Sequence, residues 1–133
     1  MNELDGLILN KSGIAYRDIL GQDRWESFTV SATITLVGTL TSVGRYRIVG
    51  ASCEFQVSLV ASTSIATTAG TSFIALPRAA GGIAGIATMT NDTSNIAVGV
   101  CHVDVATSRC YLPTQLVSAD AFTICGSYEI GVT

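Results

Sequence analysis

The sequence predicts an all-β protein, folded as an antiparallel β-sandwich or barrel of about eight strands. Apolar residues alternate with hydroxyl residues from residue 28 onward, and turn residues separate the alternating runs. No helical periodicity extends beyond two turns, which favours the same fold class. The chain has 133 residues, the size of one domain, and its 48% hydrophobic content excludes intrinsic disorder. An immunoglobulin-like sandwich is the alternative within this class.

The N-terminal segment 1–26 differs from the rest of the chain. It holds eight of the 17 charged residues (7 basic and 10 acidic in all) and shows no strict alternation. We expect it to be a linker, a short stalk or an edge strand, with one further strand possible before residue 20. The β-sandwich domain is expected to occupy residues 27–133.

The strands are predicted from the period of two that places alternate side chains on opposite faces. The strongest runs begin at Phe28, at Cys53 and at Phe122, and in each the apolar residues occupy every second position. Turn residues such as Gly81-Gly82 and the prolines Pro77 and Pro113 mark where runs end. The expected strands lie near 28–37, 44–50, 51–60, 72–76, 83–90, 95–105, 109–112 and 121–132.

One predicted strand is apolar on both faces and is built from small residues. It contains Ile83, Ala84, Gly85, Ile86 and Ala87. A strand with Gly and Ala on its second face allows another backbone to approach closely. It is therefore either a central strand or the contact between subunits at a threefold axis, and we favour the axis. The low content of charged residues, 13%, also favours an oligomer, because such a surface is suited to burial against another copy.

Charge and cysteine content limit the possible partners and compartments. The net charge of -3 argues against nucleic-acid binding, which normally requires a basic patch. The chain has no apolar stretch of about 18 residues, so we expect no membrane insertion, and its acidic N-terminus does not resemble a signal peptide. The four cysteines form no CxxC pair and are expected to be reduced and buried. Cys101 and Cys110 are the one pair that could form a bridge.

The sequence offers little that could carry catalysis, a metal or a cofactor. His102 is the single histidine, and on a strand it could pair with Asp104, two residues along. The carboxylates stand in no recognisable motif, so we predict no catalytic residue. The oxygen-rich stretch 91–95 lacks the paired carboxylates of a calcium loop and is read as a hairpin turn, so we predict no metal site.

Sugar recognition is compatible with the aromatic and short polar residues. An aromatic ring stacks on the apolar face of a sugar, and polar groups bind its hydroxyls. Each ring could instead belong to the core or to a subunit interface. The candidate carbohydrate contacts are Trp25, Tyr46, Arg47, Asn91, Asp92, Asn95 and Tyr111.

Several short patterns between residue 38 and the C-terminus resemble one known family. They are the entry Gly44-Arg45-Tyr46 with Gly50, the strand end from Phe73 to Pro77, the run Tyr111-Leu112-Pro113 and the aromatic strand Phe122 to Tyr128. Together they resemble the terminal jelly-roll domains of bacteriophage tail spikes and tail fibres. The resemblance depends on the order of these patterns along the chain.

The resemblance implies a jelly roll assembled as a homotrimer in the arrangement of tumour necrosis factor. It implies a non-catalytic domain at the tip of a receptor-binding protein, assembled in the bacterial cytoplasm and carried on the virion tail. The implied partners are two further copies of the chain, the rest of the spike or fibre, and bacterial surface polysaccharide. The alternatives are a purely structural trimerisation cap or capsid decoration module, and a polysaccharide depolymerase or esterase.

Overall fold

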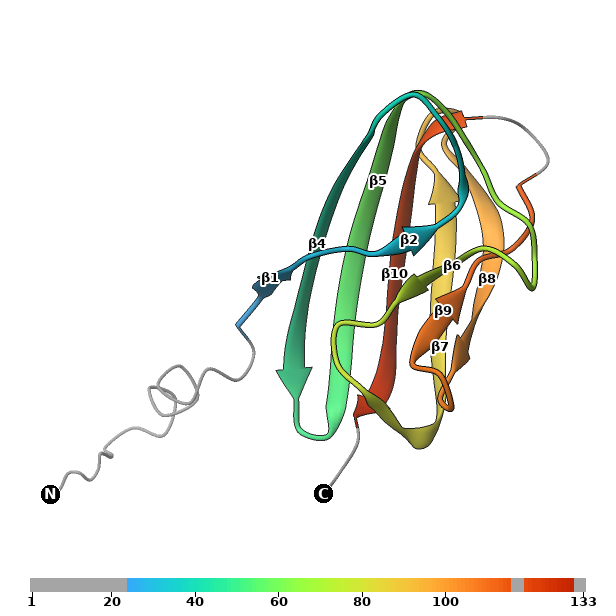
Figure 1. Ribbon diagram of the computed structural model, residues 1–133. Coiled ribbons are helices and arrows are strands. Elements are labelled where there is room, and N and C mark those ends of the chain that lie inside the picture. Colours follow the sequence, from blue (N-terminus) through green and yellow to red (C-terminus); the bar gives the residue numbers. More distant parts are fainter. Residues whose placement is uncertain (1–23, 116–118, 131–133) are drawn as a thin grey trace, which may run out of the picture.

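The computed structural model describes residues 24–115 and 119–130, and in these the chain forms only strands, turns and loops (Figure 1). The expected all-β class is confirmed. The possible strand before residue 20 lies outside the described residues. The strands are β1 (Glu26–Phe28), β2 (Ala32–Thr33), β3 (Thr35–Val37), β4 (Leu40–Val49), β5 (Ser52–Ala66), β6 (Phe73–Ala75), β7 (Ala80–Asn91), β8 (Ile96–Asp104), β9 (Arg109–Tyr111) and β10 (Ala119–Ile130).

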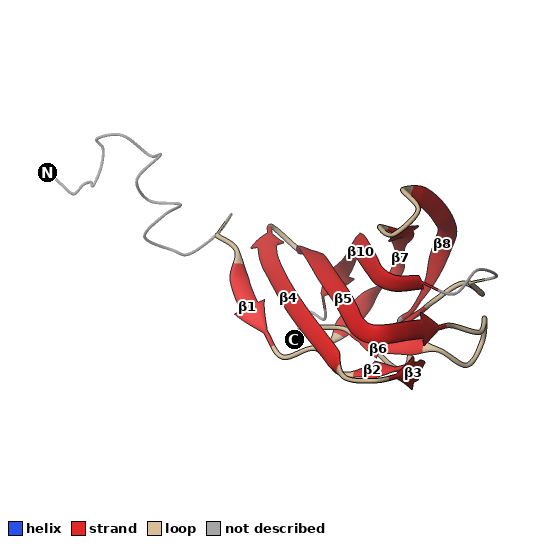
Figure 2. Ribbon diagram, turned by 90° about the horizontal axis from the view of Figure 1, so that it is seen from above, coloured by secondary structure: helices blue, strands red, loops and turns tan. Residues whose placement is uncertain are grey.

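The strands form one antiparallel sheet that curls into a half-barrel (Figure 2). Their order is β1-β4-β5-β10-β7-β8-β9-β6-β2, and β3 pairs with β5 outside this path. The curl depends on β8, because its two halves pair with different strands. Its first half pairs with β7 up to Cys101, whereas His102 to Asp104 pair with β9. The short strands β9, β6 and β2 are thereby carried in front of β4, β5, β10 and β7 (Figure 1).

The concave side of the curl holds the core, and the predicted alternation supplies it. Every second residue of β5 from Cys53 to Leu59 is buried, as expected from the sequence. The neighbouring strand β10 buries Phe122, Ile124 and Tyr128 on the same side. The opposite wall contributes, among others, Ile74, Val103, Cys110 and Leu112.

The prediction of a single strand near 28–37 is wrong, because residues 26–37 form three short strands with different partners. β1 pairs with β4, β2 with β6 at the opposite end of the sheet order, and β3 with β5. The segment therefore crosses the open side of the half-barrel (Figure 1). Gly44 permits this crossing at close range, because a Cβ there would lie 2.6–2.7 Å from side-chain atoms of Val30 and Phe28.

A second close approach joins the two central strands. Gly126 of β10 pairs with Ala87 of β7, and a Cβ on Gly126 would lie 2.5 Å from both the Ala87 Cβ and the Ile86 carbonyl oxygen. Backbone atoms cannot move aside as a flexible side chain can, so this position requires glycine. The small residue Ala87 of β7 thus serves packing within one protomer, against Gly126 of β10.

Candidate functional site

The convex face of the sheet is formed by β4, β5, β10, β7 and β8. The residues of β4, β5, β10, β7 and β8 that point away from the core form rows across it, set by the strand register. One row is Val43, Ser58, Thr123, Thr90 and Ala97, and the next is Arg45, Gln56, Cys125, Thr88 and Val100. The third row is Arg47, Glu54, Ser127 and Ile86. Hydroxyl and aliphatic side chains fill most of this face.

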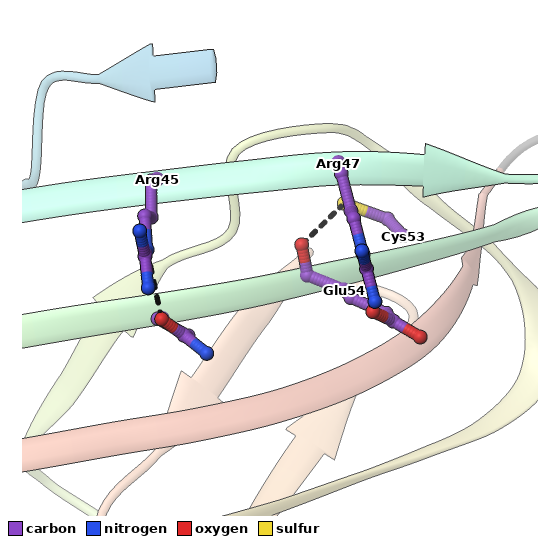
Figure 3. Close-up of polar contacts among 5 residues, drawn as sticks. Arg45, Arg47, Cys53 and Glu54 are labelled. Atoms are coloured by element: carbon purple, nitrogen blue, oxygen red, sulfur yellow. Dashed lines mark hydrogen bonds and ion pairs between the residues drawn. The ribbon is translucent and has the colours of Figure 1, made fainter. Parts of the chain in front are cut away.

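At one end of this face, two arginines of β4 reach across to β5 (Figure 3). The Arg47 Nε–H donates to Glu54 Oε1 at 2.7 Å, and the Arg45 Nε–H donates to Gln56 Oε1 at 2.8 Å. Both guanidinium carbons lie 4.8 Å from the centre of the Trp25 ring. This distance is within the range of cation–π attraction, so the ring and the two cations hold one another in place.

Beside this cluster lies an open groove of about 430 Å³. Its walls combine the indole ring, an ion pair, hydroxyls, an amide and aliphatic carbon. The lining residues are Trp25, Arg47, Glu54, Phe55, Gln56, Ile86, Ala87, Thr88, Cys125, Gly126 and Ser127. A second hollow of about 220 Å³ lies next to it and includes Val43, Arg45 and Thr123. The groove has the size of a small-ligand site and a mixed polar and apolar lining.

Two of the carbohydrate-contact candidates, Trp25 and Arg47, come together at the groove. Tyr46 follows Arg45 on β4 and therefore points to the opposite face of the strand. Its ring packs edge-on against Phe28 at 6.0 Å, and its hydroxyl donates to Glu26 at 3.3 Å. Tyr46 is thus part of the crossing between β1 and β4.

Asn91, Asp92 and Asn95 lie at the β7–β8 hairpin, and Asn91 is about 10 Å along β7 from Thr88 of the groove lining. Asn91 is 1% exposed, and its Oδ1 accepts hydrogen bonds from the backbone N–H groups of Thr93 and Ser94. Asp92 accepts from the hydroxyls of Thr90 and Thr123. Asn95 has a positive φ of 58° within the turn. The first two residues hold the hairpin together, in agreement with the reading of 91–95 as a turn.

Tyr111 lies on β9, in the other layer of the half-barrel. Its ring packs against Phe73 at 5.5 Å and lies near His102 at 6.4 Å. Arg109 stacks over the Phe73 ring at 4.1 Å. Asp104 does not pair with His102, because its carboxylate accepts from the Ala106 N–H and the Thr107 hydroxyl of the following turn.

The residues predicted at a trimer interface divide between the two faces of β7. Ala87 is 2% exposed, and Gly85 packs against Tyr128 and Val103 of the core side. Ile86 points outward and is 61% exposed. The side chains of Ile83 and Ala84 lie outside the described part of the strand.

The cysteines are free thiols, and three of the four are buried. Burial raises the pKa of Cys53, and the hydrogen bond to Cys101, followed by burial, raises the pKa of Cys110. Burial also raises the pKa of Cys125, which lines the groove. A thiol with a raised pKa is a poor nucleophile at neutral pH, so the environments of these three thiols do not activate them. The hydrogen bond with Cys110 lowers the pKa of Cys101, whose side chain is buried.

The sequence reasoning missed mainly Glu54, Gln56, Thr88 and Ser127 of the groove lining, and Arg45 of the adjoining hollow. Arg45 could have been found, because it lies two residues from Arg47 and must share its face of the strand. The others come from three further strands, and only the register brings them together.

The part of the chain that the structure describes has neither a metal-binding cluster nor a membrane-spanning helix. Among residues 24–115 and 119–130, His, Cys, Asp and Glu form no group of three that could hold a metal ion. The same part of the chain contains no helix long and apolar enough to cross a bilayer.

Comparison with protein-family models, with curated proteins and with solved structures finds no match. The class of the chain is therefore defined by its fold: an antiparallel all-β module with a curled sheet and a broad, weakly charged convex face.

Proposed function

We propose that the chain is a non-catalytic module that associates with copies of itself and binds carbohydrate. A trimeric jelly roll at the tip of a phage tail spike or fibre, bound to bacterial surface polysaccharide, is the specific form of this proposal. The half-barrel with a second layer of short strands is compatible with a jelly roll. The resemblance of the sequence to such tip domains supports the rest.

The observation that carries self-association is the exposure of aliphatic residues on the convex face. Val43 is 63% exposed, Val100 66% and Val60 43%. Val43 shares its row with Ser58, Thr123 and Thr90, whereas Val60 lies beside Thr41 in the row beyond and Val100 lies at the β8 end of the Arg45 row. The three valines, Ser58, Thr123 and Thr90 are all uncharged and are here called the association patch. A patch of this kind gains free energy when a second copy covers it.

Light scattering coupled to size exclusion tests this half of the proposal. We expect a trimeric mass at micromolar concentration, and a monomeric mass for Val43→Glu combined with Val100→Glu. Thr33→Glu is the control, because Thr33 is also exposed but lies on β2 in the other layer. A monomeric wild-type chain contradicts the proposal.

Binding to an array of oligosaccharides from bacterial capsules and lipopolysaccharides tests the carbohydrate half. We expect retention of the wild-type chain on some of these and no release of reducing ends or acetate. Self-association without retention on any of them supports the structural cap instead. Release of sugar or acetate would establish an enzyme.

A further inference from the structure

The groove beside Trp25 has a charge balance that selects among sugars. We propose that it binds a sugar residue bearing a carboxylate, such as a uronic acid within a polysaccharide. This inference rests on the proposed function, since it names the ligand class and the site of the carbohydrate binding.

The two guanidinium groups of the site are fixed by neighbouring side chains and remain accessible to a ligand. Arg45 and Arg47 lie on the same face of β4, and Trp25 contacts both. Among residues 24–115 and 119–130, both guanidinium groups bond to their neighbours through Nε. Their η nitrogens are left to bind a ligand, and a pair of N–H groups on one guanidinium matches the two oxygens of a carboxylate.

The net charge of the arginine cluster favours a ligand with a single negative charge. Arg45, Arg47 and Glu54 give the cluster a charge of about +1. Arg47 and Glu54 line the groove and balance each other, and Arg45, which lines the adjoining hollow, supplies the excess positive charge. One carboxylate neutralises this charge. A phosphate monoester carries about -1.5 to -2 at neutral pH, and Glu54 would repel the excess. The local positive charge contrasts with the net charge of -3 of the whole chain.

The remaining lining fits a sugar ring better than an acidic peptide. Thr88 and Ser127 supply hydroxyls, and the Gln56 side chain supplies an amide, all of which can exchange hydrogen bonds with sugar hydroxyls. Trp25 supplies an apolar ring face at the edge of the groove. The groove is open, so a chain can pass along it with one residue in contact with the arginines.

The site and the association patch are compatible because they occupy different parts of the convex face. Arg47, Glu54 and Ser127 lie in the row nearest Trp25, whereas Val43, Ser58 and Thr123 lie two rows away. Arg45 shares its row with Val100 of the patch but lies four strands away from it, and Thr88 of the groove lining pairs with Val100. Loss of sugar binding and loss of assembly can therefore be separated by mutation.

Titration calorimetry with matched ligands tests the inference. The probes are oligosaccharides of glucuronate, galacturonate and mannuronate, each with its carboxyl methyl ester as the uncharged partner. We expect at least one acid to bind at least tenfold more tightly than its ester, and the binding to weaken as sodium chloride rises from about 0.05 to 0.5 M. A polyglutamate peptide is expected to bind at least tenfold more weakly than that acid.

The variants Arg45→Gln and Trp25→Ala are each expected to weaken acid binding at least tenfold, without changing the mass in light scattering. The matched control is Arg109→Gln, which removes an arginine stacked on an aromatic ring in the other layer. The inference is overturned if acid and ester bind equally, if no acid binds, if polyglutamate binds as tightly as the acid, or if Arg109→Gln has the same effect as Arg45→Gln. A chain that binds neutral array sugars but no acid retains the proposed function and loses only this inference. A chain that binds no sugar at all loses both.

Discussion

Tyr128 provides the most quantitative test of how the half-barrel is held together. Its side chain is 3% exposed, and its hydroxyl both donates to the Arg78 carbonyl oxygen at 2.7 Å and accepts from the Arg78 N–H at 2.9 Å. These bonds fix the connection between β6 and β7 onto the central strand β10. The replacement Tyr128→Phe keeps the ring and removes both bonds.

The expected cost follows from the two hydrogen bonds. Each contributes about 0.5–1.5 kcal/mol net, so the variant should lose about 2 kcal/mol of unfolding free energy at neutral pH. For a chain of this size, such a loss lowers Tm by roughly 8 °C. Tyr111→Phe is the matched control, since the Tyr111 hydroxyl has only a long contact of 3.4 Å from Arg109. We expect that control to change the free energy by less than about 0.5 kcal/mol.

The same residue predicts a dependence on pH. Burial, followed by the hydrogen bond with Cys53, raises the pKa of Tyr128 above its usual value of about 10. A raised folded-state pKa means that the stabilisation is complete below pH 10 and declines above it, because the unfolded chain then loses the proton first. Above pH 10 the free energy of unfolding of the wild-type chain should therefore fall by about 1.4 kcal/mol per pH unit through this group. The Tyr128→Phe variant lacks the group and should not show this fall.

Urea unfolding followed by far-UV circular dichroism, at pH 8 and pH 11 and at one protomer concentration, measures both effects. The difference between wild type and Tyr128→Phe should be about 2 kcal/mol at pH 8 and below about 1 kcal/mol at pH 11. A difference that is equal at the two pH values, or a Tyr128→Phe variant as stable as Tyr111→Phe, would refute the reasoning.

Four other positions allow simpler tests. Gly126→Ala should lower the free energy of unfolding in urea by about 1–3 kcal/mol, because the new Cβ meets rigid backbone. The control Ser127→Ala, on the outer face, should leave it nearly unchanged, and equal effects would contradict the close approach. Phe122→Ala should cost about 3–5 kcal/mol, and a cost below 1 kcal/mol would mean that this strand does not form the core. Asn91→Ala should cost about 1–3 kcal/mol in the same assay, since it leaves two backbone N–H groups of the hairpin without their acceptor, and an unchanged midpoint would count against that role. Mass spectrometry after iodoacetamide treatment should find at most one thiol, Cys125, alkylated before unfolding; two or more would contradict the burial of the others.

The alternation in the sequence predicted which side of each strand faces the core, but it could not predict which strands would be neighbours. Phe28, Val30, Ala32 and Ile34 all pack against the core, as their period of two indicates. The chain nevertheless changes partner from β4 to β6 to β5 within these residues. Pairing partners depend on register and curvature across the sheet, and a local pattern does not contain them.

The same limit explains the outcome for the candidate site. Trp25 and Arg47 are far apart in sequence and were selected for their chemistry, and the β1–β4 pairing brings them together. Tyr46 could have been separated from Arg47 by alternation alone, because neighbouring residues of a strand point to opposite faces. Tyr111 carries no local signal of its layer, since β8 changes partner only at His102.

The two ends of the sheet bear on how copies of the chain would associate. Exposed sheet edges promote pairing between molecules, and natural proteins protect them with short strands and charged side chains. Here the terminal strands β1 and β2 have three and two residues, and the same crossing segment supplies both. β1 covers β4 only at Gly44 to Tyr46, and the next residue of β4 is the charged Arg47. Because edge pairing is disfavoured at both ends while Val43, Val60 and Val100 remain exposed, the proposed self-association is expected to use the convex face.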